Sequence, residues 1–210
     1  MKIFNDRVYS TDNLRVSRFI LKSDLGIDIL LPKENVPSLL KFPDLTEWAI
    51  IIQNKVPSWV CFRNPETGFV CGSRLVIGNF PKSSAIENFF SMEGEEFRIP
   101  EDLKEKVLRA GKFVEGIIDE ARIITVMIGE NEIKLIAKKE TGILTQISDI
   151  EYSDQNIVFH IVPTLFEQIL NRTNKITLVK RNEGSSFVSF IVGDFSHVLQ
   201  VRLGEEDFDE

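Results

Sequence analysis

The chain contains two copies of one sequence pattern, and this repeat limits the fold more than any other feature. The matching stretches lie about 128 positions apart: residues 28–31 with 156–159, Trp59 with Phe187, and Arg74-Leu75 with Arg202-Leu203. In each copy a strand leads into a short helix that contains proline, and three strands follow, the last ending in Arg-Leu. The pattern therefore predicts two similar modules.

The two copies are not expected to be equally complete. The second runs from about Phe97 to Leu203, and shifting its start back by the same interval places the start of the first roughly 30 residues before Met1. The first module is therefore expected to lack the strand and helix that open the second. We predict an incomplete module over residues 1–92, a complete module over 93–203 and an acidic tail over 204–210, with the linker within 82–96.

Residues 98–115 carry the clearest helix signal in the chain, and the helix is expected from Pro100 to Glu115. Pro100 suits a first helical position, and Glu101 and Asp102 place negative charge at the positive end of the helix dipole. An apolar stripe with helical spacing follows, formed by Leu103, Val107, Ala110 and Val114. Four of the five charges in the body of this helix are Lys or Arg, so one surface concentrates positive charge.

The remaining pattern predicts an α+β fold made mostly of antiparallel strands. A hairpin with Val8, Leu14, Val16 and Phe19 as its apolar members is expected within residues 1–22. Two short helices are expected, one capped by Asn35 with Val36, Leu39 and Leu40 buried, and one over 163–171 with Leu165, Phe166, Ile169 and Leu170 buried. Further strands are predicted at 28–32, 47–54, 58–64, 68–78, 95–99, 122–129, 131–139, 142–150, 156–162, 175–182, 185–194 and 196–203.

Composition bounds the class of protein. The 210 residues are 43% hydrophobic, which suffices for a substantial core, and the formal net charge of −7 argues against indiscriminate binding to nucleic acid while permitting a local basic face. No apolar run reaches transmembrane length and the N-terminus lacks a signal sequence, so a cytoplasmic protein without a membrane partner is expected. Cys61 and Cys71 flank a turn, and two reduced strand residues are favoured over a disulfide or redox pair.

Enzymatic function finds little support in the sequence. His160 and His197 lie in predicted strands without an acidic or thiol partner at a recognisable spacing, and no phosphate loop, dinucleotide fingerprint or zinc pattern is present. No cofactor or metal is therefore expected. A carboxylate hydrolase stays open as an alternative, because two catalytic carboxylates can be distant in the sequence and close together in the fold. Acidic residues of the C-terminal half that could contribute are Glu151, Asp154, Glu205 and Asp207.

Several segments, taken in order, resemble the bacterial DNA polymerase III β subunit, the sliding clamp. Residues 10–17 (STDNLRVS) resemble that family's TDGHRL turn, 28–41 (DILLPKENVPSLLK) its IVPRK segment, and 73–82 (SRLVIGNFPK) its KLVDGRFPD segment. The end of the second copy, residues 187–203, resembles the terminal strands of the clamp with their Arg-Leu signature. The resemblance covers nearly the whole chain and corresponds to the middle and last clamp domains. It implies modules of two helices backed by curved antiparallel sheets, arranged in a ring around a basic hole.

The resemblance also implies that the basic helix faces duplex DNA. A protein that slides should contact phosphates through flexible cations, without base readout. The implied DNA-binding residues are Lys104, Lys106, Arg109, Lys112, Arg172 and Lys175. The alternative is that they are ordinary solvated residues of an amphipathic helix.

A second implied site is a hydrophobic pocket that takes short peptides from polymerases and clamp loaders. Carried over by motif, it would comprise Thr11, Asn13, Leu14, Arg15, Val16, Pro81, Ile86, Val198, Leu199 and Val201. Asn13 and Leu14 replace the usual Gly-His, and Asn tolerates the left-handed conformation that Gly would supply. The alternative is that these are ordinary core and turn residues.

The sequence therefore predicts a clamp-like processivity factor for a DNA polymerase, without enzymatic activity, assembled as a trimer or dimer. The first alternative is a ring-incompetent relative that acts as a peptide-binding adaptor or decoy. The family chain ends at its Arg-Leu, whereas this one continues through Gly204 to Glu210. We hypothesise that Phe208 in this tail folds back over the peptide pocket as a tethered competitor.

Overall fold

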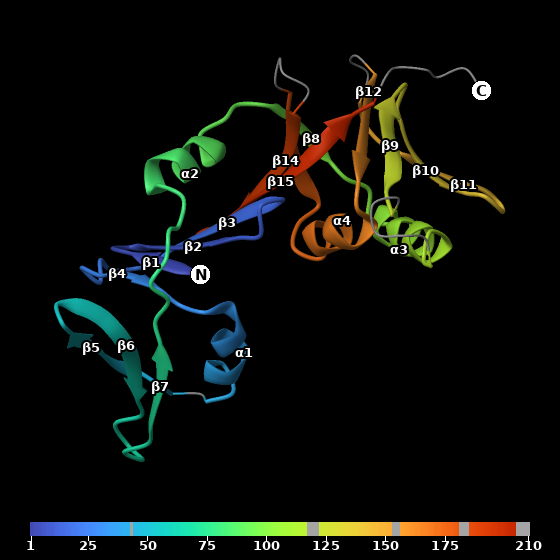
Figure 1. Ribbon diagram of the computed structural model, residues 1–210. Helices are drawn as coiled ribbons and strands as arrows, with labels where there is room; N and C mark the ends of the chain where they lie inside the picture. The colour runs from blue at the N-terminus through green and yellow to red at the C-terminus, as the bar shows by residue number, and fades with distance from the viewer. Residues whose placement is uncertain (43, 117–121, 153–155, 181–184, 205–210) are drawn as a thin grey trace. The chain divides into compact units, whose positions relative to one another are not determined.

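The chain divides into two compact units. The computed structural model describes residues 1–42, 44–116, 122–152, 156–180 and 185–204 (Figure 1). Unit 1 is Met1–Glu87 and unit 2 is Asn88–Glu210, whereas the sequence predicts the boundary between residues 92 and 93. Each unit is described separately below.

Unit 2 is an antiparallel sheet with two helices. Within the described residues the strand order is β11-β10-β9-β12-β15-β14-β13-β8. The strands are β8 (Glu95–Arg98), β9 (Ile124–Gly129), β10 (Glu132–Lys139), β11 (Gly142–Asp149), β12 (Ile157–Ile161), β13 (Lys175–Val179), β14 (Ser185–Val192) and β15 (Phe195–Leu203). Helices α3 (Leu103–Phe113) and α4 (Pro163–Leu170) lie side by side (Figure 1). The predicted α+β, mostly antiparallel fold is confirmed here.

The core of unit 2 forms between these helices and the strands. The predicted stripe on α3 is confirmed: Leu103, Val107, Ala110 and Val114 are all buried in one cluster with residues of β9, β10 and β12. On α4, Phe166 and Ile169 are buried in the same cluster, and Leu165 and Leu170 pack against it. Pro100 precedes the helix instead of opening it, because α3 begins at Leu103 after Asp102.

Unit 1 contains a four-stranded and a three-stranded antiparallel sheet. The first has the order β3-β2-β1-β4, with β1 (Lys2–Phe4), β2 (Arg7–Thr11), β3 (Arg15–Ile20) and β4 (Asp28–Leu30). The second has the order β5-β6-β7, with β5 (Glu47–Gln53), β6 (Val56–Arg63) and β7 (Val70–Arg74). Between them lie a 3-10 turn, η1 (Lys33–Asn35), and α1 (Val36–Leu39); helix α2 (Ser83–Phe90) follows and crosses the boundary into unit 2.

The backbone confirms the repeat. In each unit a three-stranded meander is joined by a fourth strand that pairs with its first strand, and a short helix and three strands follow. The amide of Val76 donates to the carbonyl of Leu30 at 2.8 Å, and the amide of Gly204 donates to that of Val158 at 2.9 Å. Both members of the second pair lie 128 positions after those of the first.

Several local predictions are wrong. Residues 83–90 form a helix, not a linker, because Ile86 is buried and Phe89 and Phe90 pack on a cluster in unit 2. The N-terminal hairpin is a three-stranded meander, since the chain also turns at Asn5, whose φ is +54°. Its buried side chain is Tyr9.

The other apolar positions of that region also differ from expectation. Leu14 is 55% exposed and Phe19 is 44% exposed, so neither is a core residue. Asn35 does not cap α1; its side-chain amide donates to the Ser73 hydroxyl at 2.7 Å. Leu40 follows the end of α1 and is 80% exposed.

The two cysteines are free, as predicted. In the β6–β7 ladder Cys61 lies opposite Gly72, and Cys71 lies opposite Phe62. The two cysteines are therefore one residue out of register and do not face each other directly across the ladder. The acidic tail from residue 205 onward, including Phe208, lies outside the described residues, as do Asp154, Glu205 and Asp207.

Candidate nucleic-acid interface

Three cations project from the solvent side of α3. Lys104, Arg109 and Lys112 are exposed because the opposite side of the helix carries the buried stripe. None of the three forms an ion pair with another residue in the described part of the chain. Their charges are thus available to an anion in solution.

Lys106 is placed differently from these three. Its Nζ forms an ion pair with Asp102 and donates to the Ser148 hydroxyl at 2.8 Å and to the carbonyl of Ile147. The Gln146 amide donates back to the carbonyl of Lys106 at 2.8 Å, so α3 is fastened to β11. The hydrogen bond from Lys106, helped by that from Ser148, lowers the pKa of Asp102. With 17% of its side chain exposed, Lys106 acts as a structural link and is poorly available to phosphates.

Two further predicted cations follow α4. Arg172 is exposed, and its guanidinium carbon lies 5.5 Å from the centre of the Phe195 ring. Stacking on an aromatic ring holds a guanidinium in place while leaving N–H donors available. Lys175, at the start of β13, forms a 2.8 Å ion pair with Glu96 in which both side chains are more than half exposed. Such an exposed pair contributes little and opens readily.

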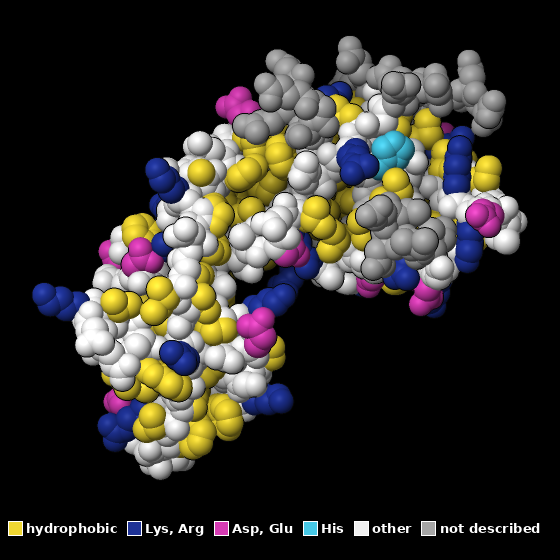
Figure 2. Space-filling view, in the orientation of Figure 1, with side chains coloured by type: hydrophobic (Ala, Val, Ile, Leu, Met, Phe, Trp, Pro, Cys, Tyr) yellow, Lys and Arg dark blue, Asp and Glu magenta, His cyan; other side chains and the backbone are white. Residues whose placement is uncertain are grey.

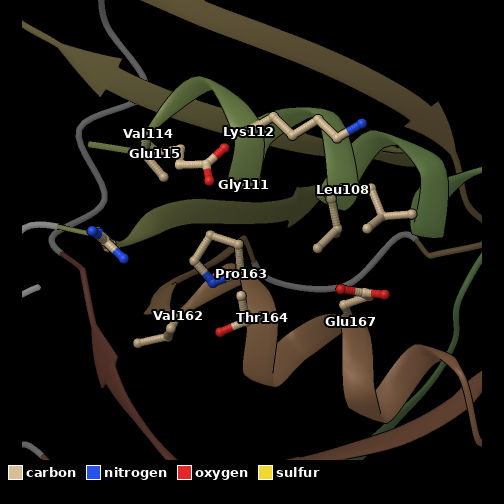
Figure 3. A pocket seen from close by; sticks show the side chains of 11 residues that line it. Leu108, Gly111, Lys112, Val114, Glu115, Val162, Pro163, Thr164 and Glu167 are labelled. Atoms are coloured by element: carbon tan, nitrogen blue, oxygen red, sulfur yellow. The ribbon is translucent and has the colours of Figure 1, made fainter. Parts of the chain in front are cut away.

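A groove of about 510 Å³ runs between α3 and α4 (Figure 3). Pro163 lies across from Gly111, where an added Cβ would approach the proline ring to 3.2 Å, so the glycine permits close packing of the two helices. The groove is lined by Val107, Leu108, Gly111, Lys112, Val114, Glu115, Arg122, Val162, Pro163, Thr164 and Glu167. Glu115 and Glu167 line the groove together with Lys112, so the charge of its lining is mixed.

The wider surface is mixed in charge. On the face seen in Figure 2, basic and acidic side chains are interspersed, as the net charge of −7 leads one to expect. Helix α3 is an exception, because it carries four cations and a single anion, Glu105. Such exposed cations suit sequence-independent contact with phosphates.

The turn at residues 11–16 in unit 1 is well ordered by its own hydrogen bonds. The Thr11 hydroxyl donates to the carbonyl of Arg15 at 2.8 Å, and Asp12 accepts from the Arg15 side chain at 2.7 Å and from the amides of Leu14 and Arg15. Burial alone would raise the pKa of Asp12, but the Arg15 side chain and the amides of Leu14 and Arg15 together lower it. Asn13 has a φ of +71°, as expected for the residue that replaces Gly. The turn therefore presents the exposed Leu14 on a hydrogen-bonded backbone.

The other residues of the predicted peptide pocket come from both units. Pro81 is exposed and Val16 is partly exposed. The remaining four, Ile86, Val198, Leu199 and Val201, are each no more than 2% exposed. In unit 2, Leu199 and Val201 belong to the main core and Val198 to a second cluster with Val179 and Phe187. These four side chains therefore offer little surface in this structure, and their part in a peptide pocket stays a prediction.

Sequence reasoning missed a partly buried ionic cluster in unit 1. Glu87 on α2 accepts hydrogen bonds from the fully buried Tyr9 at 2.6 Å and from Arg18 at 2.7 Å, and pairs with Arg7 at 3.1 Å. Burial alone would raise the pKa of Glu87, but the Tyr9 hydroxyl and the two guanidiniums lower it. Burial and the same carboxylate raise the pKa of Tyr9. Side chains alternate between the two faces of a strand, so Arg7, Tyr9 and Arg18 lie on the same face of β2 and β3. The sequence would have indicated this cluster only if the inward-facing residues of these strands had been assigned correctly.

The histidines have packing roles. The pKa of His160 is lowered by burial and by Arg202, and its Nδ1 lies 3.1 Å from the Thr125 hydroxyl oxygen. His197 stacks on Phe195 and lies beside Phe190. Among the described residues no cluster of His, Cys, Asp or Glu is suited to hold a metal ion. Nor does any described helix combine the length and apolar character needed to span a membrane.

No family model and no curated protein matches the sequence. Solved structures do match. They include a putative DNA polymerase III β subunit from Eubacterium rectale (20% identity, TM-score 0.73, covering 95% of this chain and 55% of that one). The β subunit from Streptococcus pyogenes is similar (17%, 0.73, 95% and 56%), as is a DnaN sliding clamp from Bartonella birtlesii bound to griselimycin (14%, 0.73, 98% and 57%).

These likenesses confirm the fold that the sequence motifs predict: the chain has the fold of a partial sliding clamp. It spans little more than half of the length of the clamps it matches.

Proposed function

We propose that this chain is a clamp-like processivity factor that holds duplex DNA through α3 and the residues after α4. The observation that supports the proposal is the set of exposed cations Lys104, Arg109 and Lys112 on one helix of a sliding-clamp fold. Arg172 and Lys175 extend this set. Lys106 adds to the local potential but not to direct contact.

The physical reason is that sliding requires attraction without a fixed register. Lys and Arg side chains on a helix surface can follow the phosphates while water remains between protein and bases. The acids Glu115 and Glu167 beside the groove limit the attraction, which favours movement over tight binding.

We further propose that unit 1 attaches a partner, a polymerase or clamp loader, through a short hydrophobic peptide that contacts the turn at residues 11–16. Leu14 offers an apolar side chain on a support whose backbone is already fixed, so little entropy is lost on binding. Pro81 is the other exposed member of the predicted set. In this proposal the protein tethers and positions an enzyme and does no chemistry itself.

Retention on circular DNA tests the proposal. The protein should remain on a nicked circular duplex during gel filtration and be lost once the circle is cut, because encirclement depends on topology and not on affinity. The triple variant Lys104→Gln, Arg109→Gln, Lys112→Gln should not be retained. Light scattering should show a stable dimer or trimer. A monomer that binds clamp-binding peptides but never circular DNA would instead support the adaptor or decoy.

A further inference from the structure

Arg172 differs from the exposed cations of α3 because an aromatic ring supports it. Its guanidinium carbon lies 5.5 Å from the centre of the Phe195 ring. Lys104, Arg109 and Lys112 have no such contact in the part of the chain that the structure describes. An unsupported Lys or Arg side chain loses rotamer freedom when it contacts a phosphate, and this loss weakens the contact. A side chain that is already ordered loses less.

The ring beneath Arg172 is itself held by two other rings. Phe195, at the start of β15, packs against the main core of unit 2, and the His197 ring stacks on it with the ring centres 6.3 Å apart. Phe190 is a buried member of that core, and its ring centre lies 5.8 Å from that of Phe195 and 5.5 Å from that of His197. Phe190 pairs with His197 across the β14–β15 ladder, and Phe195 follows on the same face of β15. The support beneath Arg172 is therefore anchored in the core.

The backbone that carries Arg172 is fixed as well. This residue follows the end of α4, and its amide donates to the carbonyl of Ile169 at 2.8 Å. The amide of Thr173 donates to the same carbonyl at 3.1 Å, and the amide of Lys175 donates to the Thr173 hydroxyl at 3.0 Å. Within the described residues no acidic side chain forms an ion pair with Arg172. Both ends of its side chain are thus held, while its charge stays available to a ligand.

We propose that Arg172 is a fixed phosphate contact of the surface that holds DNA, and that Phe195 is the residue that positions it. The cations of α3 contribute mobile charge, whereas Arg172 presents its N–H donors in one orientation. A planar guanidinium that is already oriented can form two parallel hydrogen bonds to one phosphate. This inference rests on the proposed binding of duplex DNA, and the experiments below separate the failure of each.

A double-mutant cycle on the full chain tests the positioning role. Affinity for a fluorescein-labelled DNA duplex is measured by anisotropy over a range of salt concentrations. Arg172→Gln should reduce the slope of log affinity against log salt by about 0.9, because one phosphate contact is lost. Phe195→Leu should leave this slope unchanged and weaken binding about two- to tenfold, since Arg172 keeps its charge but must now be ordered on binding. In the Arg172→Gln background, Phe195→Leu should have no further effect on the affinity.

Conservative changes control for charge and for folding. Arg172→Lys keeps the charge at an exposed position but loses the planar group that stacks on Phe195, so it should weaken binding by a factor similar to that of Phe195→Leu. Arg109→Lys, the same exchange at an unsupported position of α3, should leave the affinity nearly unchanged. Phe195→Tyr keeps the ring and should bind the duplex as the unsubstituted chain does. Equal losses from the two Arg→Lys exchanges would overturn the proposal.

NMR relaxation of the arginine Nε–Hε groups separates this inference from the proposed function, because it needs no DNA. In the free protein the Arg172 group should move less than the Arg109 group, and Phe195→Leu should abolish the difference. Equal mobility of the two groups would overturn the positioning role, as would an effect of Phe195→Leu on affinity that is absent or is equal with and without Arg172. If Arg172 is ordered but the unsubstituted chain binds no duplex, the proposed function fails, and the assignment of Arg172 to phosphate fails with it.

Discussion

Neutralising the three exposed cations of α3 should change the salt dependence of DNA binding by a defined amount. Each phosphate contact contributes about 0.9 to the slope of log affinity against log salt. Removing Lys104, Arg109 and Lys112 as glutamines should therefore flatten the slope by about 2.7 if all three contact phosphates. Between 50 and 200 mM salt this corresponds to the loss of about a 40-fold salt effect.

Fluorescence anisotropy of a labelled duplex, titrated at several salt concentrations, measures the slope. The matched control removes three cations elsewhere in unit 2: Arg98, Lys134 and Lys138 alternate with the buried Phe97, Ile133, Leu135 and Ala137, so they lie on the outer side of the sheet. Both variants change the net charge equally. If the two slopes fall by the same amount, only the overall charge matters and the assignment of α3 to DNA is refuted.

Four other substitutions follow from the contacts described. Lys106→Met should lower the free energy of unfolding by about 1–3 kcal/mol in urea titrations, since it breaks the link to β11, and leave the salt slope nearly unchanged. Glu87→Gln should cost about 1–3 kcal/mol at pH 7. Because the folded pKa of Glu87 is lowered, its contribution is present above the ordinary value of 4.5 and is lost as the pH falls through the folded pKa, so the stabilities of wild type and variant should converge as the solution is acidified. Gly94→Ala should destabilise by about 1–3 kcal/mol, because the new Cβ would lie 2.3 Å from the carbonyl oxygen of Leu178; an unchanged midpoint would contradict that packing. Leu14→Ala should alter stability by less than about 0.5 kcal/mol while weakening a clamp-binding peptide, as measured by calorimetry.

Strong periodicity made part of this structure predictable. The stripe from Leu103 to Val114 required only helical spacing, and the repeat required only a constant interval between similar stretches. Helix α2 was missed although Ile86, Phe89 and Phe90 have helical spacing, because the surrounding Ser, Glu and Gly suggest a linker. Lys106 shows a limit of a different kind: its position on α3 predicts exposure, but its acceptors lie on β11, some forty residues further along the chain.

The N-terminal strands show how a small error in phase propagates. Taking Val8 as the inward residue excludes Tyr9 from the core, and with it the cluster of Arg7, Arg18 and Glu87. A shift of one residue in strand phase moves every side chain to the other face of the sheet, so the inward face carries Tyr9 and the partly buried ion pairs. Motif matching likewise identified the positions of Val198, Leu199 and Val201 on β15 but could not report that these side chains are buried.

The hydrogen bond between Val76 and Leu30 is equivalent to the one between Gly204 and Val158. The two units therefore place the same backbone path in two different sequence contexts. Paired positions that stay alike, such as Ile50 and Leu178, reveal what the main-chain path demands of a side chain. Equivalent positions that differ, such as Glu47 and Lys175, reveal which side-chain properties depend on the neighbouring residues. The same substitution made in both copies would separate these two demands within a single polypeptide, with solvent, temperature and chain length identical for the two halves.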